Sequence, residues 1–341
     1  MKRSSAIVGL GLIALLLMAL PSEGLSASSS STSPVVWKAI GPFQIDYPET
    51  QLWILPFIKK VNDRSQGRLR IDYVGGPEVV PTFEQLKPVS AGTFQVVGAI
   101  VSYFYPVFPA GIVTGISPSY AEQQRASGLT KMLDDLWQKQ VNIKYLPITM
   151  DDRFHFYMRK PIKNLADLSG LKIRSTFIWD ALIKSLGANA VNLALPEAYS
   201  SLERGVVDGL ITVETGVMNY RFQEVAKYVV YPGFGHPAQG MLINLDAWKA
   251  LPDDLKKMVE QAGIDQEKET LAAIGKLAKK EQQELIDKWG VKRIDLPPSD
   301  AATLLKNWEE ESWKNLIYAR VPQIAPKLKE LTQAAERMTK P

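Results

Sequence analysis

The sequence predicts an α/β protein with two lobes that face each other across a cleft. Strand-like and helix-like segments alternate in two successive blocks, residues 34–151 and 152–237. Several strands, such as "FQVVGAIV", are continuous apolar runs, which are typical of parallel strands buried on both faces. A helical pattern of almost forty residues follows, and it is longer than one domain is wide. At 341 residues the chain has about the length of two domains.

The first block begins with a buried strand at Val35. Apolar residues then recur at helical spacing until Gly67 ends the helix. Further strands are expected at 69–74, 94–101 and 142–150, and further helices at 82–92 and 120–141. Gly, Pro and aromatic residues crowd positions 102–120, where we expect a loop.

The second block repeats this alternation. Strands are expected at 153–160, 171–175, 190–194, 206–212, 228–235 and 239–248, and helices at 176–187 and 196–205. After Leu251 the pattern becomes helical from Pro252 to Gly290, with Gly263 and Gly275 as its weak points. One bridging helix is the first interpretation, and two helices broken at one of these glycines are the alternative. Residues 299–320 predict a further helix or a pair.

The N-terminus has the features of an export signal. Lys2 and Arg3 precede the apolar run "AIVGLGLIALLLMAL", and small residues follow it. The run is shorter than the roughly 20 residues of a membrane-spanning helix, so residues 1–27 predict a cleaved signal peptide and leader rather than a retained anchor. The protein would then be periplasmic.

Composition narrows the possible functions. The chain has no cysteine, which excludes disulfides, thiolate zinc sites and cysteine nucleophiles. The net charge of +4 comes without a dense basic run, so a nucleic-acid partner is not expected.

No enzyme motif stands out. Neither His155 nor His236 has another metal-ligating residue near it at helical spacing. The chain also carries no G-x-S-x-G, P-loop or G-x-G-x-x-G sequence. Acid pairs such as Asp151–Asp152 are typical of solvated structural carboxylates. We therefore expect a protein that is not an enzyme and has no cofactor.

Arginines at strand ends point to an anion site. In "DLSGLKIRST", Leu171 and Ile173 alternate with Lys172 and Arg174, so Arg174 lies where a strand stops and a helix starts. Arginine binds a carboxylate through two parallel hydrogen bonds, and a helix start favours an anion. Arg153 lies on the neighbouring predicted strand. Either arginine alone would more often form a structural ion pair, but together they favour an anion site.

Aromatic residues in predicted loops or at helix starts could wall a ligand. These candidates are Tyr103, Phe104, Tyr105, Phe177 and Trp179. Ligand pockets are mostly apolar with a few polar anchors. Local core packing is an equally good explanation for each of them.

The run "RKPIKNLADLSGLKIRS" and the later "ALIKSLGANAVNLALPEAYSSLERGVVDGLIT" resemble the DctP-type solute-binding proteins of tripartite ATP-independent periplasmic (TRAP) transporters. The shared features are P-I-x-x-x-x-D-L-x-G-L-K-I-R, L-G-A, P-E-A-Y-x-x-L-x-x-G and V-D-G, in this order. The resemblance implies a periplasmic-binding-protein-like fold with hinge strands and a long bridging helix. We assign lobe I to 34–151 plus 238–280, lobe II to 152–237 plus 281–325, and a C-terminal tail to 326–341.

The resemblance also implies a carboxylate enclosed between the lobes and gripped by Arg174. Arg153 matches a second family arginine less securely, because the spacing here is one residue longer. Where many members carry a Gln-Glu-Asn-Pro-like run, this chain has "LITVET", which makes Thr212 and Glu214 candidates for that wall. Gln44, which precedes Ile45 after the first strand, completes the candidate set. Some relatives hold a cation beside the ligand, and Glu214 could serve it.

The expected function is capture of an organic-acid carboxylate for delivery to TRAP membrane subunits by a monomer. The aromatic candidates favour a monocarboxylate, such as a 2-oxo, hydroxy or aromatic acid. A dicarboxylate-binding member, a secreted α/β enzyme acting on an organic acid, and a sensor that presents its closed form to a receptor are the alternatives.

Overall fold

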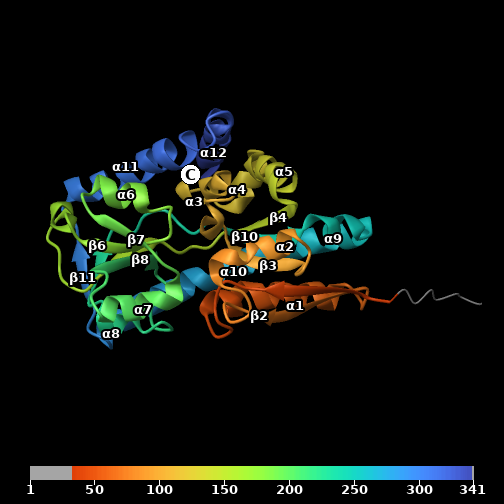
Figure 1. Cartoon of the computed structure of the whole chain (residues 1–341), viewed down its shortest axis with the longest axis horizontal. Coiled ribbons are helices and arrows are strands. Elements are labelled where there is room, and N and C mark those ends of the chain that lie inside the picture. The colour runs from red at the N-terminus through yellow and green to blue at the C-terminus, as the bar shows by residue number, and fades with distance from the viewer. Residues whose placement is uncertain (1–32, 340–341) are drawn as a thin grey trace, which may run out of the picture. The chain divides into compact units, whose positions relative to one another are not determined.

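The computed structural model describes residues 33–339, so the predicted signal peptide and leader lie outside the described residues. Residues 34–339 form one compact body with a mixed α/β architecture, as the sequence predicted. Two sheets organise the described part of this body, and one long helix contacts elements of both (Figure 1). No helix within residues 33–339 is long and apolar enough to cross a membrane.

The first sheet has the strand order β2-β1-β3-β10-β4 within the described residues. Strand β10 is antiparallel to both of its neighbours, whereas β1 is parallel to β2 and β3. All its strands come from ranges assigned to lobe I. Their bounds are β1 Val35–Ile40, β2 Leu69–Gly75, β3 Val96–Ile100, β4 Ile143–Ile148 and β10 Gln239–Asn244.

The second sheet has the order β11-β9-β5-β8-β6-β7. Strand β5 is antiparallel to β8 and β9, and β6 is parallel to β7 and β8. All its strands come from ranges assigned to lobe II. Their bounds are β5 Phe154–Met158, β6 Lys172–Ser175, β7 Asn189–Asn192, β8 Gly209–Val213, β9 Tyr228–Tyr231 and β11 Lys292–Asp295.

Helix α10, Asp253–Asp287, is one uninterrupted helix of 35 residues. At 1.5 Å per residue it is roughly 52 Å long. Its first part packs on β4 and on helix α1, Leu55–Arg64, of the first lobe, and Gln282 near its end donates a hydrogen bond to Tyr157 of the second sheet. Neither glycine interrupts the helix: a Cβ on Gly275 would lie 3.0 Å from an Asp151 carboxylate oxygen, so this glycine serves close packing, whereas a Cβ on Gly263 would make ordinary contact with Leu146 at 3.6 Å. The prediction of a single bridging helix is therefore confirmed.

The C-terminal segment leads from the second lobe back to the first. Helix α11, Pro298–Glu311, packs on α6, and α12, Ala325–Thr339, packs on α4 and α5 (Figure 1). The segment assigned as a C-terminal tail, 326–341, is thus part of an amphipathic helix over its described residues 326–339, and this helix docks on the first lobe.

Several helices are shorter than the sequence predicted. The expected helix 120–141 is two helices, because Gly128 between them has φ +84°. The expected loop 102–120 contains short helical turns and α3. The remaining bounds are α1 Leu55–Arg64, α2 Leu86–Ser90, α3 Val113–Ile116, α4 Ala121–Ala126, α5 Leu129–Val141, α6 Asp180–Ser185, α7 Leu195–Glu203, α8 Phe222–Val225 and α9 Leu245–Ala250.

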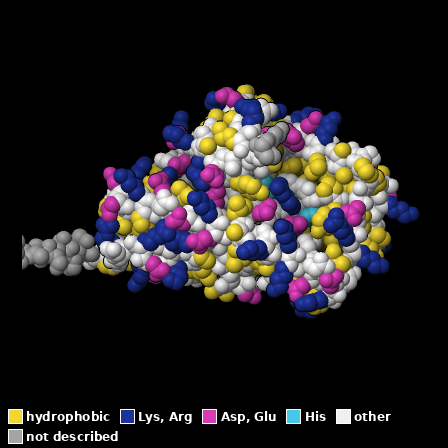
Figure 2. Space-filling view, turned by 180° about the vertical axis from the view of Figure 1, so that it is seen from behind, with side chains coloured by type: hydrophobic (Ala, Val, Ile, Leu, Met, Phe, Trp, Pro, Cys, Tyr) yellow, Lys and Arg dark blue, Asp and Glu magenta, His cyan; other side chains and the backbone are white. Residues whose placement is uncertain are grey.

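The surface carries mixed charge. On the face in Figure 2, Lys and Arg side chains lie among Asp and Glu side chains and between small apolar areas. Among the described residues, several surface charges form exposed ion pairs, such as Lys59 with Asp63 and Arg293 with Asp295. Such exposed pairs contribute little to stability.

Candidate ligand-binding site

Arg174 is a buried cation near the end of strand β6. It is 1% exposed, and its guanidinium is held by two backbone carbonyls. Nε donates to the carbonyl oxygen of Leu193 at 2.9 Å, and Nη1 donates to that of Ile211 at 3.0 Å. Nη2 has no hydrogen-bond partner among the described residues. Arginine stays charged even when buried, so this fixed donor is available to an anion.

Two aromatic side chains flank this guanidinium. The ring of Trp179 lies 5.7 Å from the guanidinium carbon, which is a cation–π distance. Burial lowers the pKa of Arg174, and the electrostatic influence of the neighbouring Tyr103 partly offsets that effect. Burial raises the pKa of Tyr103, against the opposing influence of Arg174. Tyr103 therefore stays a neutral phenol at neutral pH, and Arg174 stays charged because arginine keeps its proton even when buried.

These residues line a small cavity of about 30 Å³ to which both lobes contribute. The first lobe supplies mainly aromatic and polar groups, and the second supplies Arg174, Thr212 and apolar or aromatic groups. The lining residues are Phe43, Tyr47, Glu49, Ile100, Ser102, Tyr103, Phe154, Arg174, Trp179, Leu195, Thr212, Val213, Pro237 and Gln239.

The cavity walls carry hydrogen-bonding groups without partners among residues 33–339. They include the donors Arg174 Nη2, Trp179 Nε1 and Gln239 Nε2, and the oxygens Gln239 Oε1 and Glu49 Oε2. Buried polar atoms are rarely left unpaired in proteins, and exceptions need an explanation. Three donors and two carboxyl or amide oxygens around one cavity match a small ligand with an anionic end and a second oxygen.

The structure brings four of the candidate residues together at this cavity: Arg174, Trp179, Tyr103 and Thr212. It places the other candidates elsewhere. Tyr105 donates its hydroxyl to the carbonyl oxygen of Leu316 at 3.1 Å, so it anchors the C-terminal segment. Gln44 is exposed to solvent, beside the exposed Ile45.

Phe177 also lies outside this cavity. Its backbone has φ +65°, so residues 176–179 form a turn instead of the expected first helical turn, and α6 begins at Asp180. This turn directs the Phe177 ring toward Phe83 of the first lobe, with ring centroids 5.7 Å apart. The ring lies at the edge of a surface groove between these segments.

The parity of strand β5 explains why Arg153 lies away from the cavity. Phe154 lines the cavity, so its neighbours Arg153 and His155 lie on the other face of the strand, where both would contact a Cβ on Gly233. Arg153 Nη1 donates to the carbonyl oxygen of Gly235 at 3.4 Å. The sequence supplied the correct period but not the face of the strand that meets the ligand.

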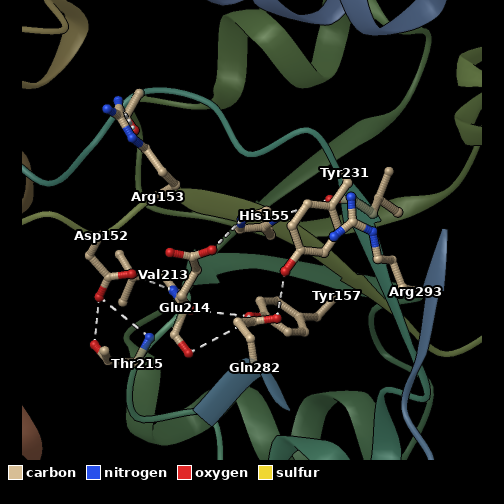
Figure 3. A network of polar contacts seen from close by, with 12 residues as sticks. Asp152, Arg153, His155, Tyr157, Val213, Glu214, Thr215, Tyr231, Gln282 and Arg293 are labelled. Atoms are coloured by element: carbon tan, nitrogen blue, oxygen red, sulfur yellow. Dashed lines mark hydrogen bonds and ion pairs between the residues drawn. The ribbon is translucent and has the colours of Figure 1, made fainter. Parts of the chain in front are cut away.

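Glu214 belongs to a polar network, here called the hinge network, that joins the segments around β5, β8 and β9 to the end of α10 (Figure 3). Its carboxylate lies 3.2 Å from His155 Nε2, and its backbone carbonyl faces Gln282 Nε2 at 3.4 Å. Gln282 also accepts a hydrogen bond from the hydroxyl of Tyr231. Glu214 therefore stabilises the hinge network, and the structure places it beside the cavity rather than in its wall.

Asp152 is the buried centre of the same network. It accepts hydrogen bonds from Glu214 N at 2.7 Å and from Thr215 Oγ1 at 2.5 Å. Burial raises the pKa of Asp152 to about 7, although these donors oppose the rise. Burial likewise raises the pKa of Glu281 to about 7.

Among the cavity residues that were not predicted from the sequence, Glu49 and Gln239 carry polar atoms without partners in the described part of the chain. Glu49 lies in "DYPETQLW", which is typical of the start of an amphipathic helix, and Gln239 opens the apolar strand "QGMLIN". Both side chains are 1% exposed. The polar residue that opens an apolar strand was the signal that could have identified Gln239, whereas Glu49 carried no such signal. Within residues 33–339, no group of three or more His, Cys, Asp and Glu side chains is placed to hold a metal ion.

Comparison with known proteins gives a family match. The sequence profile of the DctP family, described as bacterial extracellular solute-binding protein, family 7, matches residues 47–317. A relative from Nostoc sp., named monocarboxylate 2-oxoacid-binding periplasmic protein, is 26% identical over 61% of this chain. The match spans 59% of that relative's length.

Two solved structures share the fold. A TRAP periplasmic solute-binding protein from Pseudoalteromonas atlantica, with bound sodium and pyruvate, has a TM-score of 0.78 and 22% identity over 89% of this chain and 95% of its own. A TRAP transporter solute-binding protein from Bordetella bronchiseptica, with calcium and picolinate at its active site, has a TM-score of 0.77 and 23% identity over 89% and 93% of the two chains. At these identities the likeness concerns the fold.

Proposed function

Because the chain belongs to the DctP family of bacterial extracellular solute-binding proteins, family 7, we propose that it captures a small organic-acid carboxylate between its lobes and delivers it to the membrane subunits of a TRAP transporter. It would act in the periplasm, after removal of the signal peptide. The expected ligand is a monocarboxylate, such as a 2-oxo, hydroxy or aromatic acid. The Nostoc relative, named for 2-oxoacid binding, supports this choice.

One observation carries the proposal: the buried Arg174 directs an unpaired donor at a cavity that both lobes line. A carboxylate there would replace the missing partner and form a charge-assisted hydrogen bond. The cavity has one arginine and several aromatic or apolar walls, which suits one carboxylate with a compact remainder.

The transport mechanism follows from the position of the cavity. A ligand that contacts both lobes binds the closed state better than the open state, so it shifts the population toward closure. The membrane subunits would then distinguish loaded from empty protein by the closed surface. No chemical change of the ligand is required, and we propose a binding protein rather than an enzyme.

A thermal-shift screen over mono-, di- and aromatic carboxylates tests this function. We expect a monocarboxylate to raise the melting temperature and to be recovered unchanged. A chain that binds no carboxylate, or that consumes one, would contradict the proposal. Preference for a dicarboxylate would instead favour the alternative family member considered above.

A further inference from the structure

We propose that Glu49 determines ligand specificity: it faces the cavity as an uncharged carboxyl group, donates a hydrogen bond to an oxo or hydroxyl oxygen of the ligand, and excludes a second carboxylate. This inference rests on the proposed function and assigns a role to a residue outside the arginine anchor. The ligand class that follows is 2-oxo or 2-hydroxy monocarboxylates.

The burial of Glu49 supports the uncharged form. The side chain is 1% exposed, and Oε2 has no hydrogen-bond partner among the described residues. Glu49 forms no ion pair within 4.0 Å in the described part of the chain, in contrast to Glu267, which pairs with Arg125. An ionised carboxylate buried without a cation is strongly disfavoured, so such a group takes up a proton.

The groups that face Glu49 also favour its uncharged form. Asp152 from the segment between β4 and β5 and Glu281 from α10 are its acidic neighbours, and its own backbone N–H is a nearby donor. Tyr47 and Tyr103, which also line the cavity, face it as neutral phenols. Burial, then Asp152, raises the pKa of Glu49 well above its usual value, and Glu281 adds to this effect.

The Arg174 and Glu49 side chains that line the cavity therefore differ in what they can bind. Arg174 offers a permanent positive charge, which fits a carboxylate. Around Glu49 the structure provides carboxyl and phenol groups, so a second carboxylate would be desolvated there beside Asp152 and Glu281 without a cation. A neutral oxo or hydroxyl oxygen needs one donor, and the Glu49 O–H supplies it.

Calorimetry with four probes tests this inference: pyruvate, lactate, propionate (which lacks the second oxygen) and succinate. Wild type is expected to bind pyruvate or lactate at least tenfold more tightly than propionate and succinate. Glu49→Gln keeps a neutral donor and should bind pyruvate within about threefold of wild type. Glu49→Leu removes the donor and should weaken pyruvate at least tenfold while leaving propionate nearly unchanged. Asp46→Asn, on an exposed acid of the same loop, is the matched control and should behave as wild type.

Each contrary result has a distinct meaning. A loss of tenfold or more in Glu49→Gln, together with wild-type binding that requires added sodium or calcium, would show a charged Glu49 and overturn the inference. Wild-type preference for succinate, or no change in Glu49→Leu, would also overturn it while leaving carboxylate capture intact. If wild type binds none of the probes or other carboxylates, the proposed function and this inference both fail. Far-UV circular dichroism of each variant establishes that it is folded.

Discussion

The carboxylate of Glu281 accepts the backbone N–H of Gly216 at 2.8 Å, and this hydrogen bond joins the long helix to the segment that leaves β8. Asp152 accepts the backbone N–H of the adjacent Glu214. Two buried carboxyl groups with raised pKa values thus hold one short segment of the hinge network. Their protonation links pH to the stability of the protein.

Asp152→Asn is expected to reduce the pH dependence of stability. Burial raises the pKa of Asp152 from 3.8 to about 7, so the folded state binds more protons than the unfolded state between these values. Its contribution to the unfolding free energy therefore falls as pH rises from about 4 to 7. Relative to Asp152→Asn, wild type should lose about 1–3 kcal/mol between pH 5 and pH 8, measured by urea unfolding.

The pH dependence of wild type must be compared with that of Asp152→Asn, because His236 changes the unfolding free energy with pH in the opposite direction. Burial lowers its pKa to about 4, so its contribution to stability rises with pH up to about 6.5. This contribution is common to wild type and variant and cancels. Asp151→Asn, on an exposed neighbour, is the control. Parallel pH profiles for wild type and Asp152→Asn would contradict the prediction.

Gly216→Ala is expected to weaken ligand binding at least tenfold by opposing lobe closure. Gly216 has φ +75°, and a Cβ there would lie 2.5 Å from the ring of Tyr47 in the other lobe. That rigid contact arises where the lobes meet, so it selectively raises the free energy of the closed state. Titration calorimetry with the ligand found in the screen measures the effect.

Gly170→Ala controls for the backbone contribution. Gly170 has φ +77°, and a Cβ at this position would meet nothing within 4 Å, so alanine there bears a similar conformational cost without a contact between lobes. It should lower the unfolding free energy by about 1 kcal/mol and leave affinity unchanged. If Gly216→Ala and Gly170→Ala bind the ligand with equal affinity, the prediction that a side chain at Gly216 opposes lobe closure is wrong.

Arg174→Ala is expected to weaken carboxylate binding by roughly a hundredfold or more, because loss of one partner of a buried charge pair costs about 3–5 kcal/mol. Arg174→Lys should also bind weakly, since an ammonium cannot reproduce the fork of donors. We expect no matching loss of stability without ligand, because the substitution also removes a buried charge. Calorimetry and urea unfolding measure the two effects.

Arg153→Ala is the matched control for Arg174. Its guanidinium contacts the carbonyl oxygen of Gly235 on the face of β5 opposite Phe154. Its affinity should stay within about threefold of wild type. A large loss in this variant with normal binding by Arg174→Ala would reverse the assignment of the two arginines.

The two glycines of α10 are expected to respond differently to alanine. Gly263→Ala should raise the unfolding free energy by about 0.5–1 kcal/mol, since the new methyl makes ordinary contact with Leu146 at 3.6 Å and glycine is a poor helix former. Gly275→Ala should raise the unfolding free energy less than Gly263→Ala does, or lower it. The reason is that the new Cβ would lie 3.0 Å from an Asp151 carboxylate oxygen, so the Asp151 side chain would have to move away. Urea unfolding of both variants checks the order, and an equal gain would contradict it.

Local pattern predicted the elements whose signals are continuous. Helix α10 followed from a long amphipathic pattern with Pro252 before it, and Arg174 was placed at a strand end by simple alternation. The turn at 176–179 was missed because Phe177 adopts a positive φ that non-glycine residues rarely take. Tertiary contacts that the sequence does not reveal stabilise this conformation.

The site itself was predicted in part for a related reason. Alternation assigns residues to the two faces of a strand but does not say which face meets the ligand. Arg153 was therefore predicted as a site residue, whereas its neighbour Phe154 lines the cavity. Glu49 was hidden because one acid in an amphipathic segment ordinarily faces solvent. Its significance depends on Asp152 and Glu281, which are far away in sequence and adjacent in the fold.

Strand β10 lies between β3 and β4 in the first sheet but follows every strand from β5 to β9 in the chain. A ribosome that has synthesised the first 150 residues has therefore made β4 without its sheet neighbour. The first lobe cannot be completed until about a hundred further residues, which build most of the second sheet, have emerged. The two lobes must mature together, and a fragment that ends near residue 150 is not an independent half of this protein.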